Sequence, residues 1–99
     1  MKVAFIVNND VYTPRVMELL GSLGVDYFTQ FEHVKGKGHD TEPHLGTRSF
    51  PGFNSVLMIA FEDEGLLGKL IEGIVVANKQ IQRSDDRIRV FQLPLERIV

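Results

Sequence analysis

Two runs of consecutive apolar residues constrain the fold of this chain most strongly. The first run covers residues 3–7 and the second covers residues 56–61. Short runs of this kind are typical of strands that are buried on both faces of a sheet. Between them, residues 34–53 hold four of the nine glycines and two of the three histidines. A loop of this length is uncommon in a compact domain and is usually functional or disordered. We therefore expect the runs to form a scaffold and the loop to carry the function.

Helix signals follow each of the two runs. Thr13-Pro14 suits a helix start, because proline fits the first turn, and Gly24 suits the helix end. The apolar face of this first helix is expected at helical spacing, with Val16, Leu19, Leu20 and Leu23. Asp63 and Glu64 favour the start of a second helix, where carboxylates interact well with the helix dipole. Its apolar face is expected at Leu66, Leu67, Leu70, Ile71, Ile74 and Val75.

Two further strands complete the pattern. Residues 26–35 are rich in aromatic and β-branched side chains, and residues 88–93 are expected to form a fourth strand that stops near Pro94. The order βαββαβ predicts an α+β, ferredoxin-like fold, with an antiparallel four-stranded sheet and two helices on one face. Because the two central strands favour burial on both faces, the simplest expectation is an oligomer that packs sheet faces together. The alternative is a mildly apolar face that stays exposed.

Composition and charge narrow the class of protein. The 99 residues suit a single domain, 1–99. A net charge of −2 lacks the cationic surface that nucleic-acid binding requires, so no nucleic-acid partner is expected. The absence of cysteine excludes disulfides and thiolate chemistry. No apolar run approaches the ~20 residues of a membrane span, and the apolar N-terminus is too short for a signal peptide. We therefore expect a cytoplasmic protein.

Two motifs resemble those of a known family. Residues 32–39, EHVKGKGH, resemble the "E-V-K-G-x-G" entry to the long loop of P-II nitrogen-regulatory proteins. Residues 87–96, RIRVFQLPLE, resemble the fourth strand of that family, and the order of elements agrees over nearly the whole chain. The resemblance implies a divergent P-II-like homotrimer with a ligand site in the cleft between subunits. The base of the loop and the segment before the fourth strand would line this cleft.

One segment departs from the family pattern. P-II proteins carry a glycine-rich "T-G-x-x-G-D-G-K" phosphate-binding loop before the fourth strand, whereas residues 80–87 here read QIQRSDDR. Glycine lets backbone amides approach a phosphate closely, and the adjacent Asp85 and Asp86 would repel one. Arg87 stands where the family has its lysine. We therefore expect weaker ATP binding than in ordinary P-II proteins, or a different ligand.

Glycines and basic residues define a candidate anion site. Gly36-Lys37-Gly38 could form a backbone concavity for an anion, or the glycines could simply permit a bend out of the sheet. The basic residues expected around this concavity are Lys35, Lys37, Arg48, Arg87 and Arg89. The expected ligand is a small anionic effector, and an adenine nucleotide is one form that it could take.

The three histidines define a candidate metal site. His33, His39 and His44 lie close together in the sequence, with Asp40 and Glu42 between the last two. Imidazole and carboxylate together suit divalent ions such as Zn²⁺, Cu²⁺ or Ni²⁺. Their spacing matches no compact metal motif, so the alternative is that they are ordinary solvated residues of the loop.

These features lead to two functional hypotheses. The first is a P-II-like trimeric sensor that binds a small anionic effector at the subunit cleft and signals to a protein partner through residues 36–52. The second is a divalent-metal-binding trimer of the CutA type that uses the loop histidines. We expect no enzyme, because there is no nucleophile elbow and no phosphate-binding or dinucleotide glycine motif.

Overall fold

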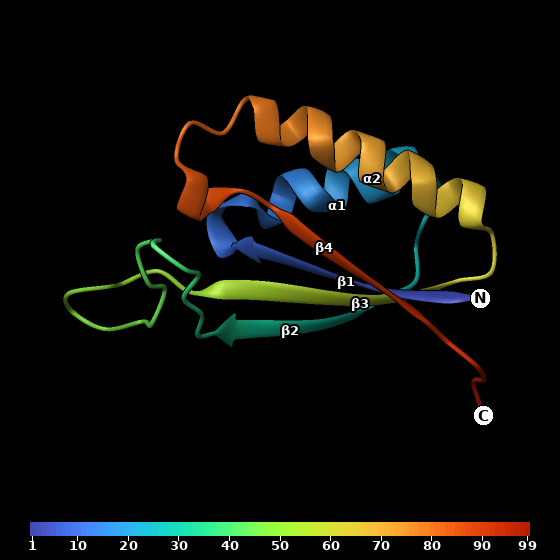
Figure 1. Ribbon diagram of the computed structural model, residues 1–99, viewed down its shortest axis with the longest axis horizontal. Helices are drawn as coiled ribbons and strands as arrows, with labels where there is room; N and C mark the ends of the chain where they lie inside the picture. Colours follow the sequence, from blue (N-terminus) through green and yellow to red (C-terminus); the bar gives the residue numbers. More distant parts are fainter.

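The computed structural model describes all 99 residues as one antiparallel sheet covered by two helices (Figure 1). The strands are β1 (Lys2–Asn9), β2 (Thr29–Val34), β3 (Asn54–Phe61) and β4 (Arg89–Pro94). The helices are α1 (Thr13–Ser22) and α2 (Glu64–Lys79), and the short 3-10 turns are η1 (Asp10–Tyr12) and η2 (Ser84–Asp86). The strand order is β2-β3-β1-β4, and every pairing is antiparallel. The predicted ferredoxin-like arrangement is confirmed.

Local chemistry sets the ends of the helices. Proline lies in the first turn of α1, where its missing amide proton costs no hydrogen bond. Asp63 caps α2 by accepting a hydrogen bond from the amide of Leu66 at 3.2 Å, which satisfies one of the free donors at a helix start. None of the helices combines the length and the hydrophobicity that a bilayer crossing requires.

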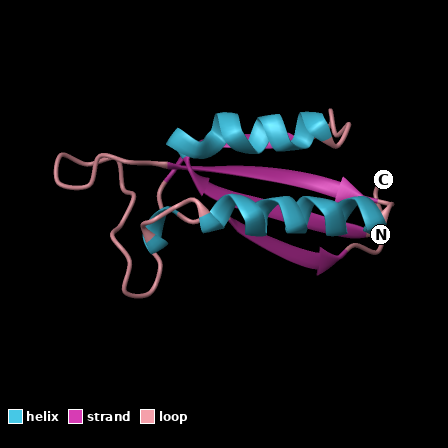
Figure 2. Cartoon of the chain, turned by 90° about the horizontal axis from the view of Figure 1, so that it is seen from above, coloured by secondary structure: helices cyan, strands magenta, loops and turns pink.

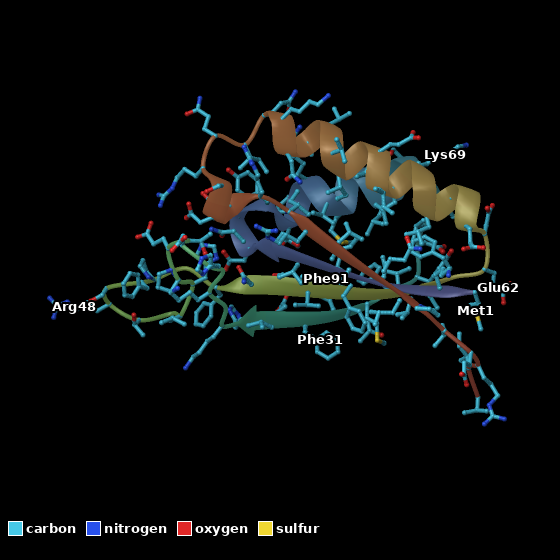
Figure 3. The ribbon with its side chains drawn as sticks, viewed as in Figure 1. Met1, Phe31, Arg48, Glu62, Lys69 and Phe91 are labelled. Carbon is cyan, nitrogen blue, oxygen red and sulfur yellow. The ribbon has the colours of Figure 1, made fainter.

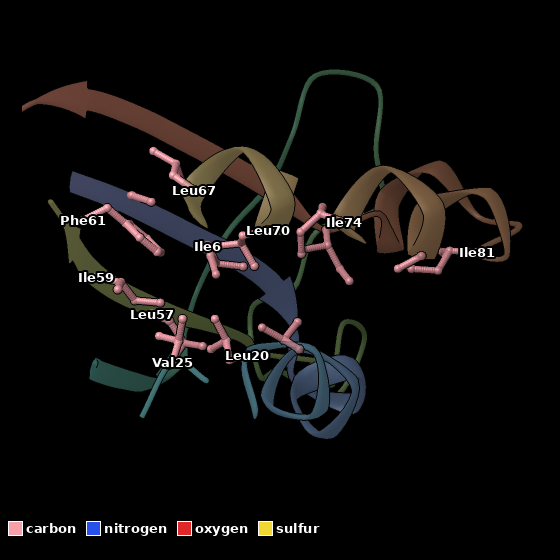
Figure 4. Packing of buried hydrophobic residues seen from close by; sticks show 14 residues of the cluster. Ile6, Leu20, Val25, Leu57, Ile59, Phe61, Leu67, Leu70, Ile74 and Ile81 are labelled. Atoms are coloured by element: carbon pink, nitrogen blue, oxygen red, sulfur yellow. The ribbon is translucent and has the colours of Figure 1, made fainter. Parts of the chain in front are cut away.

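The core lies between the helices and one face of the sheet. Figure 2 shows both helices running along the same side of the strands. Alternate residues of β1 and β3 are buried beneath them, including Ile6 and Leu57, and meet Leu20 of α1 and Leu70 of α2 (Figure 4). The predicted apolar face of α2 is wrong at its end, because Val75 is 51% exposed.

The other face of the sheet is apolar and has no cover within the chain. The register places Phe5 of β1 opposite Met58 of β3 and Phe91 of β4 on this face. Phe31 of β2 lies there too, with its ring directed away from the helices (Figure 3), and is 47% exposed. Burial on both faces of the central strands, as the sequence predicts, is therefore not reached within one chain. We call this surface the open face.

Candidate functional site

A hollow of about 400 Å³ lies at the end of the sheet where the long loop leaves it. Its walls come from the ends of β1 and β2, the first half of the loop, the start of β3 and the segment from η2 into β4. The residues that line it include Asn8, Lys35, Gly36, Lys37, Gly38, His44, Asn54, Asp85, Arg87 and Arg89. Segments far apart in the sequence therefore meet at one place.

The first half of the loop folds back onto the sheet. Gly36 and His44 form an isolated antiparallel bridge, with N···O distances of 2.8 and 2.7 Å. Between them, the amide of Gly38 donates to the hydroxyl of Thr41 at 2.8 Å. These bonds place residues 36–44 as one wall of the hollow.

The second half of the loop forms a separate turn that projects away from the hollow. The amide of Gly46 donates to the carbonyl of Gly52 at 2.9 Å, and that of Thr47 donates to the carbonyl of Phe50 at 2.8 Å. Arg48 lies exposed at the tip of this turn (Figure 3) and does not line the hollow. The structure therefore separates Arg48 from the other predicted ligand-binding residues.

Four predicted basic residues do meet at the hollow. Lys35 and Lys37 come from the base of the loop, and Arg87 and Arg89 come from the segment that enters β4. None of these side chains takes part in an ion pair. Their charges therefore remain available to a ligand.

The glycine backbone does not form the free concavity that the sequence suggests. The amide of Gly36 is bound to the carbonyl of His44, and the amide of Gly38 is bound to Thr41. Both donors are therefore used inside the loop. The positive charge of the hollow therefore comes from the basic side chains rather than from these amides.

The three histidines lie in three different surroundings. His33 sits in the irregular part of β2, with φ of 55°, and its ring makes an edge contact with Phe53 at 5.1 Å. The side chain of His39 is 96% exposed and pairs with Asp40 at 3.1 Å. Only His44 is buried and lines the hollow. The structure therefore does not gather the histidines into the predicted three-histidine set.

His44 instead meets two carboxylates of η2. Its Nε2 lies 3.6 Å from Oδ1 of Asp86, and its Nδ1 lies 2.7 Å from Oδ1 of Asn54. Potential ligand atoms of His44, Asp85 and Asp86 all lie within 4.8 Å of one another. Asn9 also donates to Asp86 at 3.0 Å, so the end of β1 holds this carboxylate in place.

Arg83 joins η2 to the loop from the outside. It contacts the carboxylate of Glu42 and lies 3.2 Å from Oδ2 of Asp85. The hydrogen bond with Glu42, followed by the charge of Asp85, raises the pKa of Arg83 above its usual value. These contacts connect the loop to η2 across the rim of the hollow.

Sequence reasoning missed two polar residues of the site. Asn8 is 2% exposed, and its Oδ1 is buried without a hydrogen-bond donor. Asn54 lies behind His44 and accepts its Nδ1 proton. Asn8 could have been found from its position, because it continues the buried alternation of Ala4 and Ile6 along β1.

A larger hollow of about 600 Å³ lies between α1 and α2. Its walls are mainly apolar, and it contains none of the predicted ligand-binding or metal residues. The smaller hollow at the loop is therefore the candidate site.

The chain is an α+β protein with a ferredoxin-like sheet and a hollow at the base of a long loop. Solved structures share this fold. A structure of CPII, a nitrogen regulatory PII-like protein from Thiomonas intermedia K12, bound to ADP, AMP and bicarbonate, matches with a TM-score of 0.66 and 20% identity. The match covers 99% of this chain and 94% of the CPII chain.

A second CPII structure, bound to ADP and bicarbonate, matches with a TM-score of 0.69 and 22% identity. It covers 97% of this chain and 88% of the other. Searches with the sequence match neither a protein-family model nor a curated protein. The chain therefore has the PII-like fold, and this similarity is detected from the structure and not from the sequence.

Proposed function

We propose that this chain is a divergent P-II-like regulator that binds a small anionic effector in the hollow at the loop base. The observation that carries this proposal is the meeting of four unpaired basic side chains from two distant segments: Lys35, Lys37, Arg87 and Arg89. Such a cluster lowers the free energy of a bound anion through charge-assisted hydrogen bonds. The function proposed is binding rather than catalysis.

The proposed assembly is a homotrimer built on the open face. Val7, Val56 and Phe91 belong to this face and also line the hollow. A neighbouring subunit on the open face would therefore also cover one side of the hollow. The effector would then lie in a cleft between subunits, as the resemblance to P-II proteins implies.

The class of effector follows from the segment before β4. The amides of Asp86 and Arg87 donate to carbonyls of the same turn, at 3.1 and 3.3 Å, so they are not directed toward a phosphate. Asp85 adds negative charge to the same wall. These features favour a small carboxylate or bicarbonate-like anion over a nucleoside triphosphate. CPII contains ADP and bicarbonate together, so both ligand types belong in the test.

The loop is the proposed signalling element. Residues 36–44 form a wall of the hollow, whereas residues 46–52 project from it. An effector that contacts Lys35 or Lys37 would act on the base of the loop and change how the outer turn is presented to a protein partner. Ordering of a segment by a ligand is a common form of switching.

Replacing Arg87 by alanine tests the effector site. A lost charge-assisted hydrogen bond costs about 1.5–3 kcal/mol, so the affinity for the effector should fall about 10- to 150-fold. Arg48→Ala is the matched control, because Arg48 lies at the loop tip outside the hollow. Titration calorimetry with bicarbonate, small carboxylates, ADP and ATP measures the change. Equal losses in both variants, or no binding of any of these anions, would contradict the proposal.

A further inference from the structure

Nε2 of His44 and Oδ1 of Asp86 face each other across 3.6 Å. The carbonyl oxygen of Asn54 can only accept, so Nδ1 of His44 carries the ring proton at 2.7 Å from it. In the neutral ring, Nε2 then keeps a lone pair. This atom lies 3.6 Å from Oδ1 of Asp86, which is longer than a hydrogen bond. A cation bound between the Nε2 lone pair of His44 and the carboxylate of Asp86 would interact favourably with both groups.

We propose that His44, Asp85 and Asp86 bind a divalent transition-metal ion of the Zn²⁺ type. Two ligand atoms at ~2.1 Å from a tetrahedral ion lie about 3.4 Å apart, close to the 3.6 Å between Nε2 and Oδ1. One imidazole with two carboxylates also suits Zn²⁺ better than Mg²⁺.

The surroundings of the three ligands resemble an outer coordination shell. Ligating histidines commonly donate their other ring proton to an oxygen, and ligating carboxylates are themselves hydrogen-bonded. Asn54 has the first role for His44, and Asn9 has the second for Asp86. Gly36 leaves room for Asn54, because a Cβ at this position would lie 2.5 Å from its Nδ2. The loop backbone therefore helps to orient the histidine.

A second observation in the same hollow also points to a ligand. Asn8 lines the hollow and is 2% exposed, and its Oδ1 is a buried acceptor with no donor. Buried acceptors of this kind normally have a partner. Three protein ligands leave the fourth position of a tetrahedral ion to water, and a metal-bound water is a strong donor.

This metal site uses different residues of the hollow from the proposed effector site. It uses the histidine and the carboxylates of the hollow, whereas the effector uses its basic residues. Arg83 contacts only Oδ2 of Asp85, so the other carboxylate oxygen stays available. Zn²⁺ bound here would join the first half of the loop to η2 and would raise the melting temperature of the protein.

Calorimetric titration of the full chain with ZnCl₂, after treatment with a chelator, tests the proposal. We expect one Zn²⁺ per chain and no comparable binding of MgCl₂. His44→Gln and Asp86→Asn each remove a ligand and should weaken Zn²⁺ binding by more than the roughly 10- to 100-fold that loss of an outer-shell partner costs. His39→Ala is the matched control, because His39 is an exposed histidine of the same loop, and its affinity should equal that of the wild type.

Variants of Asn54 distinguish metal binding by His44 from a merely structural role of this histidine. Asn54→Ala removes the acceptor for Nδ1 and should weaken Zn²⁺ binding about 10- to 100-fold, whereas Asn54→Asp should restore it. Circular dichroism checks the fold of each variant. If His44→Gln does not fold, the Zn²⁺ affinities of Asp85→Asn and Asp86→Asn decide whether the metal binds at this cluster. Unchanged Zn²⁺ affinity in Asp85→Asn and Asp86→Asn, or loss of Zn²⁺ binding in His39→Ala, would overturn the metal site.

Discussion

Met58→Asp is expected to leave each chain folded while it separates the proposed homotrimer into monomers. Met58 lies on the open face, opposite Phe5 of β1, where a neighbouring subunit would bury it. A carboxylate buried without a partner costs several kcal/mol, which corresponds to association weakened at least ~100-fold. Analytical ultracentrifugation at micromolar concentration measures the mass, and circular dichroism follows the fold.

Two further variants make this result specific. Val75→Asp places the same charge on an exposed position of α2 and should leave the mass unchanged. Ile59→Asp should unfold the chain itself, because Ile59 is 1% exposed beneath the helices. If the wild-type protein sediments as a stable monomer, the proposed homotrimer is contradicted.

Gly46→Ala is expected to destabilise the outer turn of the loop. Gly46 has φ of 64°, and a Cβ there would lie 2.0 Å from the ring of Phe53. The left-handed backbone costs about 1–2 kcal/mol for a residue with a side chain, and overpacking adds about 1–3 kcal/mol. Hydrogen exchange should show at least ~10-fold faster exchange of the amides at positions 46 and 47, together with a lower melting temperature.

Gly52→Ala is the matched control within the same turn. A Cβ at this position would meet the ring of His44 at 3.6 Å, which is an ordinary contact, and its φ is not positive. This variant should keep the exchange rates and the melting temperature of the wild type. Equal behaviour of the two alanine variants would show that Phe53 does not hold the turn.

The scaffold could be predicted from local patterns in the sequence. The runs at 3–7 and 56–61 became the central strands, and the helical spacing of Val16 and Leu20 placed α1 over the sheet. These predictions succeeded because strand and helix periodicities report burial directly. Val75 failed because it lies about 100° around α2 from its buried neighbour Ile74, and is 51% exposed although Ile74 and Ala77 are buried.

The site was less predictable, because its contacts join distant segments. Lys35 and Arg87 line the same hollow, as the resemblance to P-II proteins implies. The bridge between Gly36 and His44, however, sends His44 toward η2 and leaves His39 in solvent. The hydrogen bond of Asn9 with Asp86 spans 77 positions. No local spacing encodes such a pairing. The sequence therefore indicated one group of histidines, whereas the structure places the three histidines in three separate surroundings.

The open face also affects how the protein would respond to its own abundance. Only 17 of the 99 residues are buried within one chain, a small core for holding a fold of this length. If neighbouring copies supply the remaining apolar contacts, stability becomes a property of the population, and dilution alone lowers the melting temperature. Newly made chains would then be most vulnerable to proteolysis while they are scarce, and each additional copy would protect those already present.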